Sequence, residues 1–227
     1  MKLFCMVLVS LAVQPIATGS DSDQATKKSL SETDRLLAVA DHKDIDNRRL
    51  AAADICILLL KRNGEWRQSD SLDWKILREQ EFRLEASHVR KSDQTEDLAV
   101  PNMCAHCMGM LRGGAWLSRP AEGEDSLEQA VAKLAKESKD PAVRALLLLG
   151  LASSSRIAAR DAVVAATQDA HLGVRKSACY LIERRTRSAF GPIGNIHIGS
   201  TENDVRVAGE RIRNAYAKDK VFRLGSN

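Results

Sequence analysis

Aromatic residues, long apolar runs and known catalytic motifs are scarce or missing in this sequence. Phe, Trp and Tyr make up only 4% of the 227 residues, whereas alanine and leucine abound, which favours helices packed through small aliphatic side chains. Beyond the N-terminus no segment approaches the roughly 18 consecutive apolar residues of a membrane-spanning helix. The sequence contains no G-x-S-x-G, H-E-x-x-H, P-loop or dinucleotide-binding pattern. We therefore expect that the protein is not an enzyme.

A strong excess of charge of one sign is also missing. The chain has 34 basic and 30 acidic residues, a net charge of +4 that is spread along the sequence. This distribution gives no basic patch for nucleic acid, so we expect no nucleic-acid partner. A hydrophobic content of 44% beside 28% charged residues predicts a folded protein.

The N-terminus has the pattern of a secretory signal. MKLFCMVLVSLAV places Lys2 before a short apolar run, and the small residues Ala17 and Gly19 follow. This order of basic, apolar and small residues is typical of a cleaved signal peptide, although an N-terminal core helix would be the simpler alternative. We expect cleavage of residues 1–19, a secreted or periplasmic location and no membrane contact after cleavage.

The remaining chain is predicted to be all-α. Polar residues 20–29 form a flexible leader, residues 30–91 an N-terminal helical block, residues 92–124 a loop-rich segment and residues 218–227 a tail. Helix boundaries are indicated by Asn63-Gly64 as a stop, by Asp125 with Glu128 as a start, and by Asp140 before Pro141. Residues 125–217 contain the most regular helical pattern.

A repeat runs through residues 125–217. The pairs Val143-Arg144, Val174-Arg175 and Val205-Arg206 recur at a spacing of 31 residues. A period of this size with two short helices per unit predicts an α-solenoid, because one antiparallel helix pair cannot bury its own apolar face. The glycine-rich stretch SAFGPIGNIHIGS replaces the first helix of the third unit. A helical bundle without repeats is the alternative fold.

The stretches DPAVRALLLLGLA, HLGVRKSACYLI and ENDVRVAGERI resemble the second helices of HEAT-type repeats, and the short period is similar to the HEAT-like repeats of phycobilisome lyases. The resemblance implies antiparallel helix pairs, an irregular central insertion and a scaffold that binds another protein. It also implies that Arg144, Arg175 and Arg206 brace adjacent repeats. A basic ladder that binds a partner's acidic groups is the functional alternative for these arginines.

Residues 102–110, NMCAHCMGM, contain the only candidate ligand motif. Cys104 and Cys107 would close as a disulfide in an oxidising compartment. With His106 they could instead bind zinc, or with the nearby methionines copper, or they could exchange thiols or remain inert thiols. Covalent haem is disfavoured because Met108, not histidine, follows Cys107. Cys56 and Cys179 lie in apolar helical patterns and are expected to be buried.

Taken together, the patterns predict an exported, non-catalytic interaction scaffold without a cofactor. Its partner would be another protein of unknown identity. The alternative hypothesis is a periplasmic metal-binding or thiol-redox accessory protein that uses Cys104, His106 and Cys107, with zinc or copper at the two cysteines.

Overall fold

The computed structural model describes residues 32–40, 42–65, 111–123, 125–217, 220 and 222. Most of these residues are helical and none forms a strand, so the predicted all-α class is confirmed for this part of the chain. The helices are α1 (Glu32–Ala40), α2 (Ile45–Arg62), α5 (Ser126–Glu137), α6 (Pro141–Ala152), α7 (Ile157–Ala165), the 3-10 helix η2 (Ala166–Gln168), α8 (Leu172–Thr186) and α9 (Glu202–Ala217).

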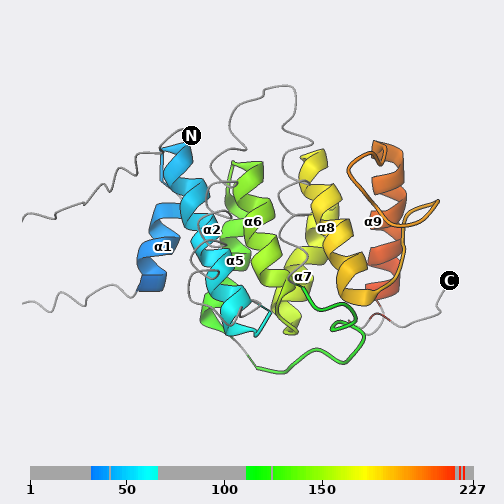
Figure 1. Ribbon diagram of the computed structural model, residues 1–227, viewed down its shortest axis with the longest axis horizontal. Helices are drawn as coiled ribbons and strands as arrows, with labels where there is room; N and C mark the ends of the chain where they lie inside the picture. The colour runs from blue at the N-terminus through cyan, green and yellow to red at the C-terminus, as the bar shows by residue number, and fades with distance from the viewer. Residues whose placement is uncertain are drawn as a thin grey trace, which may run out of the picture.

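The helices contact one another in two rows. In the first row α2 packs on α6, α6 on α8 and α8 on α9, and Figure 1 shows these four helices following one another across the molecule in chain order. In the second row α1 contacts α5, and α5 contacts α7. The chain alternates between the rows, since α1 packs on α2, α5 on α6 and α7 on α8. Each first-row helix therefore touches the next helix of its own row.

Side-chain caps begin the helices where the sequence predicted them. Asp125 is the N-cap of α5, where one carboxylate oxygen accepts the N–H groups of Leu127 and Glu128 at 3.1 Å each. Asp140 caps α6 by accepting the N–H of Ala142 at 2.9 Å, and Pro141 occupies the first turn. Both acids satisfy N–H groups that have no partner inside the helix.

The C-terminus of α2 also agrees with its predicted stop. The helix ends at Arg62 with Asn63 as the C-cap, and Gly64 follows with a φ of +67°. Glycine adopts this left-handed backbone without steric cost, which lets the chain turn sharply away from α2.

The second-row helix α7 ends in a tighter turn. It spans Ile157–Ala165 and continues as the 3-10 turn η2. Thr167 lies in this turn, and its hydroxyl donates to the carbonyl of Val164 at 2.8 Å. Such local side-chain bonds compete with the helical ladder. The stretch at 188–200 contains no helix, as its glycines predicted, and is closed by a bridge between Gly191 and Gly194.

The core is densest between α2 and α6. Ten of the twelve residues of α6 are buried, and α2, the helix that contacts α6 most extensively, buries Ile55, Leu59 and Leu60. A Cβ on Gly150 would lie 3.0 Å from Cδ1 of Leu59 and 3.1 Å from Cα of Cys56. Glycine at this position therefore lets the two helix backbones approach closely.

Several sequence predictions fall outside the described residues. These are the signal peptide at 1–19, the leader at 20–29 and all residues from 66 to 110, which include the end of the N-terminal helical block and the CAHC motif. The described part of the loop-rich segment, residues 111–123, has turns and bends but no helix. Two residues of the expected C-terminal tail are placed, and Phe222 is buried against Trp116 and Tyr216.

Candidate functional site

Two arginines of the predicted column connect neighbouring helices of the first row. Arg144 of α6 donates from Nε and Nη2 to the two carboxylate oxygens of Asp169, at 2.8 and 2.7 Å. Arg175 of α8 donates to the carboxylate of Glu202 at the start of α9, and to the carbonyls of Asp169 and Ala170 at 2.8 and 2.9 Å. A bidentate guanidinium–carboxylate pair fixes direction as well as distance.

Arg206 differs from the other two arginines. It donates to Oδ1 of Asn203 at 3.0 Å and lies 3.6 Å from Glu210, and both partners belong to its own helix α9. Its side chain is 65% exposed. These contacts join no second helix, so the geometry of Arg206 departs from the bracing contact expected for all three arginines.

The sequence analysis missed the arginines of α2. Arg48 donates to the carbonyls of His42 and Lys43 at 2.8 Å each, six and five residues earlier, as Arg175 does with its own preceding loop. Arg49 donates to Asp140 from Nε at 2.9 Å, and both side chains are almost fully buried. The sequence feature that could have identified Arg48 is its position four residues after Asp44. Arg144 lies at the same spacing after Asp140.

A buried arginine joins three distant segments. Arg185 of α8 is 1% exposed and donates to the carboxylate of Glu65, to the carbonyl of Arg112 at 3.1 Å and to the carbonyl of Ser153 at 3.2 Å. Glu65 in turn accepts the N–H of Arg112 at 2.8 Å. Burial lowers the pKa of the Arg185 guanidinium, while the bond to Glu65 raises it.

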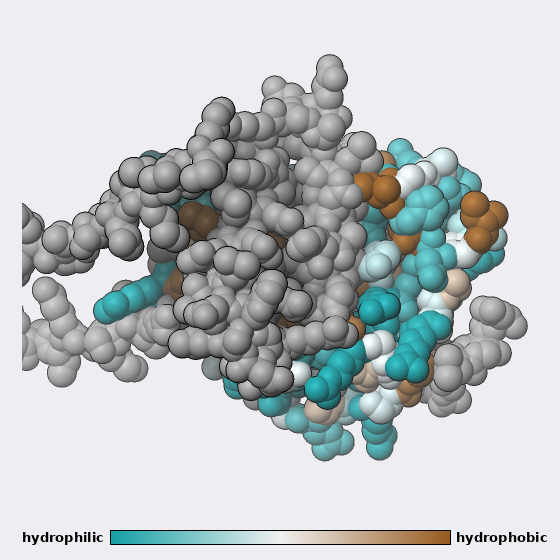
Figure 2. All heavy atoms as spheres, viewed as in Figure 1, coloured by the Kyte–Doolittle hydropathy of each residue, from teal (hydrophilic) through white to brown (hydrophobic). Residues whose placement is uncertain are grey.

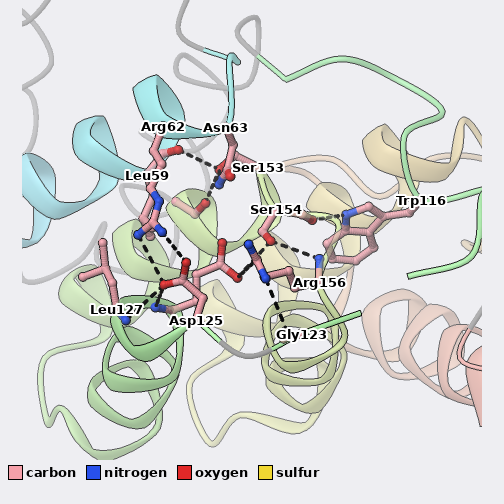
Figure 3. A network of polar contacts seen from close by, with 12 residues as sticks. Leu59, Arg62, Asn63, Trp116, Gly123, Asp125, Leu127, Ser153, Ser154 and Arg156 are labelled. Carbon is pink, nitrogen blue, oxygen red and sulfur yellow. Dashed lines mark hydrogen bonds and ion pairs between the residues drawn. The ribbon is translucent and has the colours of Figure 1, made fainter. Parts of the chain in front are cut away.

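A second polar network ties the ends of α2 and α6 to α5. Figure 3 shows Arg62 directed at the Asp125 carboxylate. Arg62 donates two hydrogen bonds to this carboxylate, and the one from Nη1 to Oδ1 measures 3.3 Å. Asn63 donates to the hydroxyl of Ser153 at 2.9 Å, and Ser154 donates to Glu128 at 3.0 Å. Burial raises the pKa of the Glu128 carboxyl. These groups lie at helix ends, where backbone groups need partners.

Trp116 anchors the segment 111–123. Its ring is fully buried, and Nε1 donates to the carbonyl of Ser154 at 2.8 Å, as Figure 3 shows. The guanidinium of Arg160 lies 5.6 Å from the ring centroid and donates to the carbonyls of Trp116 and Ser118 at 3.3 and 3.0 Å. Burial lowers the pKa of Arg160 to about 10. The segment is thus fixed by a cation–π contact and main-chain bonds.

A pocket of about 380 Å³ opens beside this segment. It is lined by Gly113, Tyr180, Glu183, Arg184, Arg187 and Asn195. The residues come from the anchored segment, from the C-terminal end of α8 and from the loop at 188–200. Pockets of this size accommodate a small molecule or a few side chains of a partner.

Glu183 lines the pocket and holds the loop. Its carboxylate accepts the N–H groups of Phe190 at 2.8 Å, Gly191 at 3.3 Å and Ile196 at 2.7 Å. The side chain is 4% exposed, and burial raises its pKa to about 7 against the opposing effect of the three N–H donors. Glu183 therefore fixes the loop more than it offers charge to the pocket.

The predicted cysteines divide into two groups. Cys56 and Cys179 are buried in α2 and α8, as expected, and burial raises the pKa of the Cys179 thiol to about 12. Cys104, His106 and Cys107 lie outside the described residues. Within the described ranges, no group of three or more histidine, cysteine or acidic residues could hold a metal ion. None of the described helices is long and apolar enough to cross a membrane.

Comparison of the chain with protein-family models, with curated proteins and with solved structures gives no match.

The arginine pairs between first-row helices predict unequal effects of two similar substitutions. Arg144→Ala leaves the largely buried Asp169 without its bidentate partner and should lower the free energy of unfolding by about 2 kcal/mol. Arg206→Ala removes exposed contacts within one helix and should cost less than about 0.5 kcal/mol. Urea unfolding of both variants measures the difference, and equal losses would contradict the interpretation.

The raised pKa of Glu183 predicts that the stability of the protein depends on pH. Its pKa of about 7 exceeds the ordinary value of 4.5, so between these pH values the folded state binds more protons than the unfolded state. The contribution of Glu183 is therefore fully present below pH 4.5 and is lost as pH rises through 7, with a total of about 3 kcal/mol.

Urea unfolding at several pH values between 4.5 and 8, on the wild type and on Glu183→Gln, tests this dependence. As pH rises, the free energy of unfolding of the wild type should fall relative to that of Glu183→Gln. The exposed residue Glu137 of α5 offers a matched control, because Glu137→Gln should leave the wild-type pH dependence unchanged. If Glu183→Gln shows the same pH dependence of the unfolding free energy as the wild type, Glu183 is not its source.

Proposed function

We propose that the chain is an exported, non-catalytic scaffold for another protein, built as an α-solenoid of HEAT-like helix pairs. The observation that carries the proposal is a contact that recurs along the first row. An arginine of α2, α6 or α8 bonds to an acidic residue at or just before the start of the next first-row helix, namely Asp140, Asp169 or Glu202. Repeated contacts between equivalent neighbours are what a stacked array requires.

The roles of the buried charges also favour a scaffold. Glu65, Asp125, Asp140 and Glu183 each accept hydrogen bonds from arginines or backbone N–H groups that hold helix ends and loops. Each carboxylate therefore has a structural task. A stack of helix pairs held in this way offers a long surface to a partner, which is the usual use of such arrays.

Export and the state of CAHC belong to the same proposal. We expect residues 1–19 to be removed and Cys104 to be joined to Cys107, because neighbouring thiols oxidise outside the cytosol. The disulfide would close the segment before Leu111, whose following residues are anchored through Trp116. No metal or other cofactor is required by this arrangement.

Native mass spectrometry of the protein isolated from the medium or periplasm of its own cells tests the proposal. We expect a chain without residues 1–19, in a complex of fixed stoichiometry with a second protein. Its mass should lie about 2 Da below the all-thiol value for a single disulfide, and Cys104→Ser with Cys107→Ser should remove this difference.

Two results would contradict the proposal. A protein that runs alone and carries an extra mass of about 63–65 Da that a chelator removes would support a metal-binding accessory role at Cys104 and Cys107. A protein that keeps residues 1–19 and is found only inside the cell would exclude export.

A further inference from the structure

We propose that the pocket beside α8 and the neighbouring tip of the loop at 188–200 form a docking site for a protein segment that carries acidic residues next to an apolar residue. The inference rests on the proposed scaffold function and names the chemistry of the partner. Three independent features of the described residues support it: two arginines, a left-handed backbone at one of them and an exposed isoleucine.

The first feature is positive charge at the pocket. Arg184 and Arg187 line it and are both exposed. Within the described part of the chain, neither guanidinium has an acidic partner, in contrast to Arg144, Arg175 and Arg185, which all bond to carboxylates. Two guanidinium groups at one pocket would bind carboxylates through charge-assisted bonds.

The second feature is the backbone of Arg187. It is the C-cap of α8 with a φ of +55°, in the left-handed region where glycine or asparagine is usual. An arginine is strained there, and such strain is typical of positions kept for function. The side chain lies against Gly113, because a Cβ on that glycine would lie 3.0 Å from Nε and 3.2 Å from Cγ of Arg187. Gly113 thus leaves room for the arginine stem to lie on the anchored segment.

The third feature is Ile193, which is 92% exposed at the tip of the loop. The tip is a narrow turn closed by the bridge between Gly191 and Gly194, and a Cβ on Gly191 would lie only 2.3 Å from the carbonyl oxygen of Gly194. Glu183 holds this turn from one side through three N–H groups, and Arg211 donates to the carbonyls of Phe190 and Gly191 at 3.3 and 3.1 Å.

An apolar side chain that a fixed turn presents to solvent would add buried apolar area to a contact with a partner. On the face drawn in Figure 2, the described surface toward the C-terminal end is mainly hydrophilic. Hydrophobic residues lie on it as separate groups. Asn195 lines the pocket and follows Ile193 by two residues, so the loop that carries the apolar tip also forms part of the pocket wall. A small inorganic anion would use the arginines and leave Ile193 uncovered, whereas a peptide covers both.

The test is a selection of binding peptides from a random heptapeptide phage library on the purified chain without residues 1–19. We expect enriched peptides to carry aspartate or glutamate beside an apolar residue. The best of them, synthesised with a fluorescein label, should bind in solution with an anisotropy change that weakens as salt concentration rises.

Three variants decide whether these peptides use the proposed site. Arg187→Gly should weaken binding at least tenfold while the melting temperature stays equal or rises, because glycine removes the left-handed strain. Ile193→Ser should weaken binding several-fold without a change in melting temperature, since the side chain is already exposed. Arg206→Ala, which removes an equal charge from α9, should leave binding unchanged.

The opposite results overturn the inference. Three results would each exclude an acidic segment at this pocket. The enriched peptides could lack acidic residues, no peptide could be enriched, or peptide binding could survive Arg187→Gly. A further possible result is that no acidic peptide is selected, while the chain binds a sulfated polysaccharide such as heparin and loses this binding in Arg187→Gly. That result would assign the arginines to a carbohydrate partner. The scaffold proposal fails separately, if the protein isolated from its cells has no protein partner.

Discussion

The buried guanidinium of Arg185 is the interaction on which the described structure depends most. It reaches three segments that are far apart in sequence: the residue after the turn at the end of α2, the segment before Trp116 and the end of α6. A buried arginine is costly unless its donors find partners. Glu65 and two carbonyl oxygens supply them for Nη1 and Nη2, while Nε has no partner among the described residues. The position of the anchored segment, and with it one wall of the pocket, follows from this requirement.

The same chemistry recurs at a smaller scale along the first row of helices. Arginines on α2, α6 and α8 each bond to an acid at or just before the start of the next helix in that row, so apolar packing between neighbours is combined with a directional polar contact. Apolar surfaces alone would allow helices to slide. The bidentate pairs at Asp140 and Asp169 fix the register of α2 on α6 and of α6 on α8. The last arginine in this column, Arg206, bonds within its own helix α9.

Local features of the fold could be predicted from sequence, and long-range ones could not. Asp125 and Asp140 were identified as caps because a cap and its helix are neighbours in the chain. The pair of Glu65 and Arg185 joins residues 120 positions apart, and nothing near either residue indicates the other. Arg185 lies in the run ERRTR, which resembles an exposed charged surface, although it is almost fully buried.

The candidate site shows the same division. The motif at Cys104, His106 and Cys107 was prominent in the sequence but lies outside the described residues. The pocket was not predicted, because it forms where the segment 111–123, α8 and the loop at 188–200 meet. The glycines of this stretch did predict the absence of a helix, but the exposure of Ile193 depends on how Glu183 and Arg211 hold the turn at 191–194.

Amide hydrogen exchange in Arg185→Met is the most direct measurement of whether one buried guanidinium holds these segments together. The informative amides are those of Arg112, which donates to Glu65, and Trp116, which donates to the backbone carbonyl of Arg185 at 3.2 Å. The substitution leaves that carbonyl in place, so faster exchange at Trp116 would report detachment of the segment itself. The account predicts at least about tenfold faster exchange at both amides. Unchanged exchange at both amides, with faster exchange confined to the last turn of α8, would contradict it.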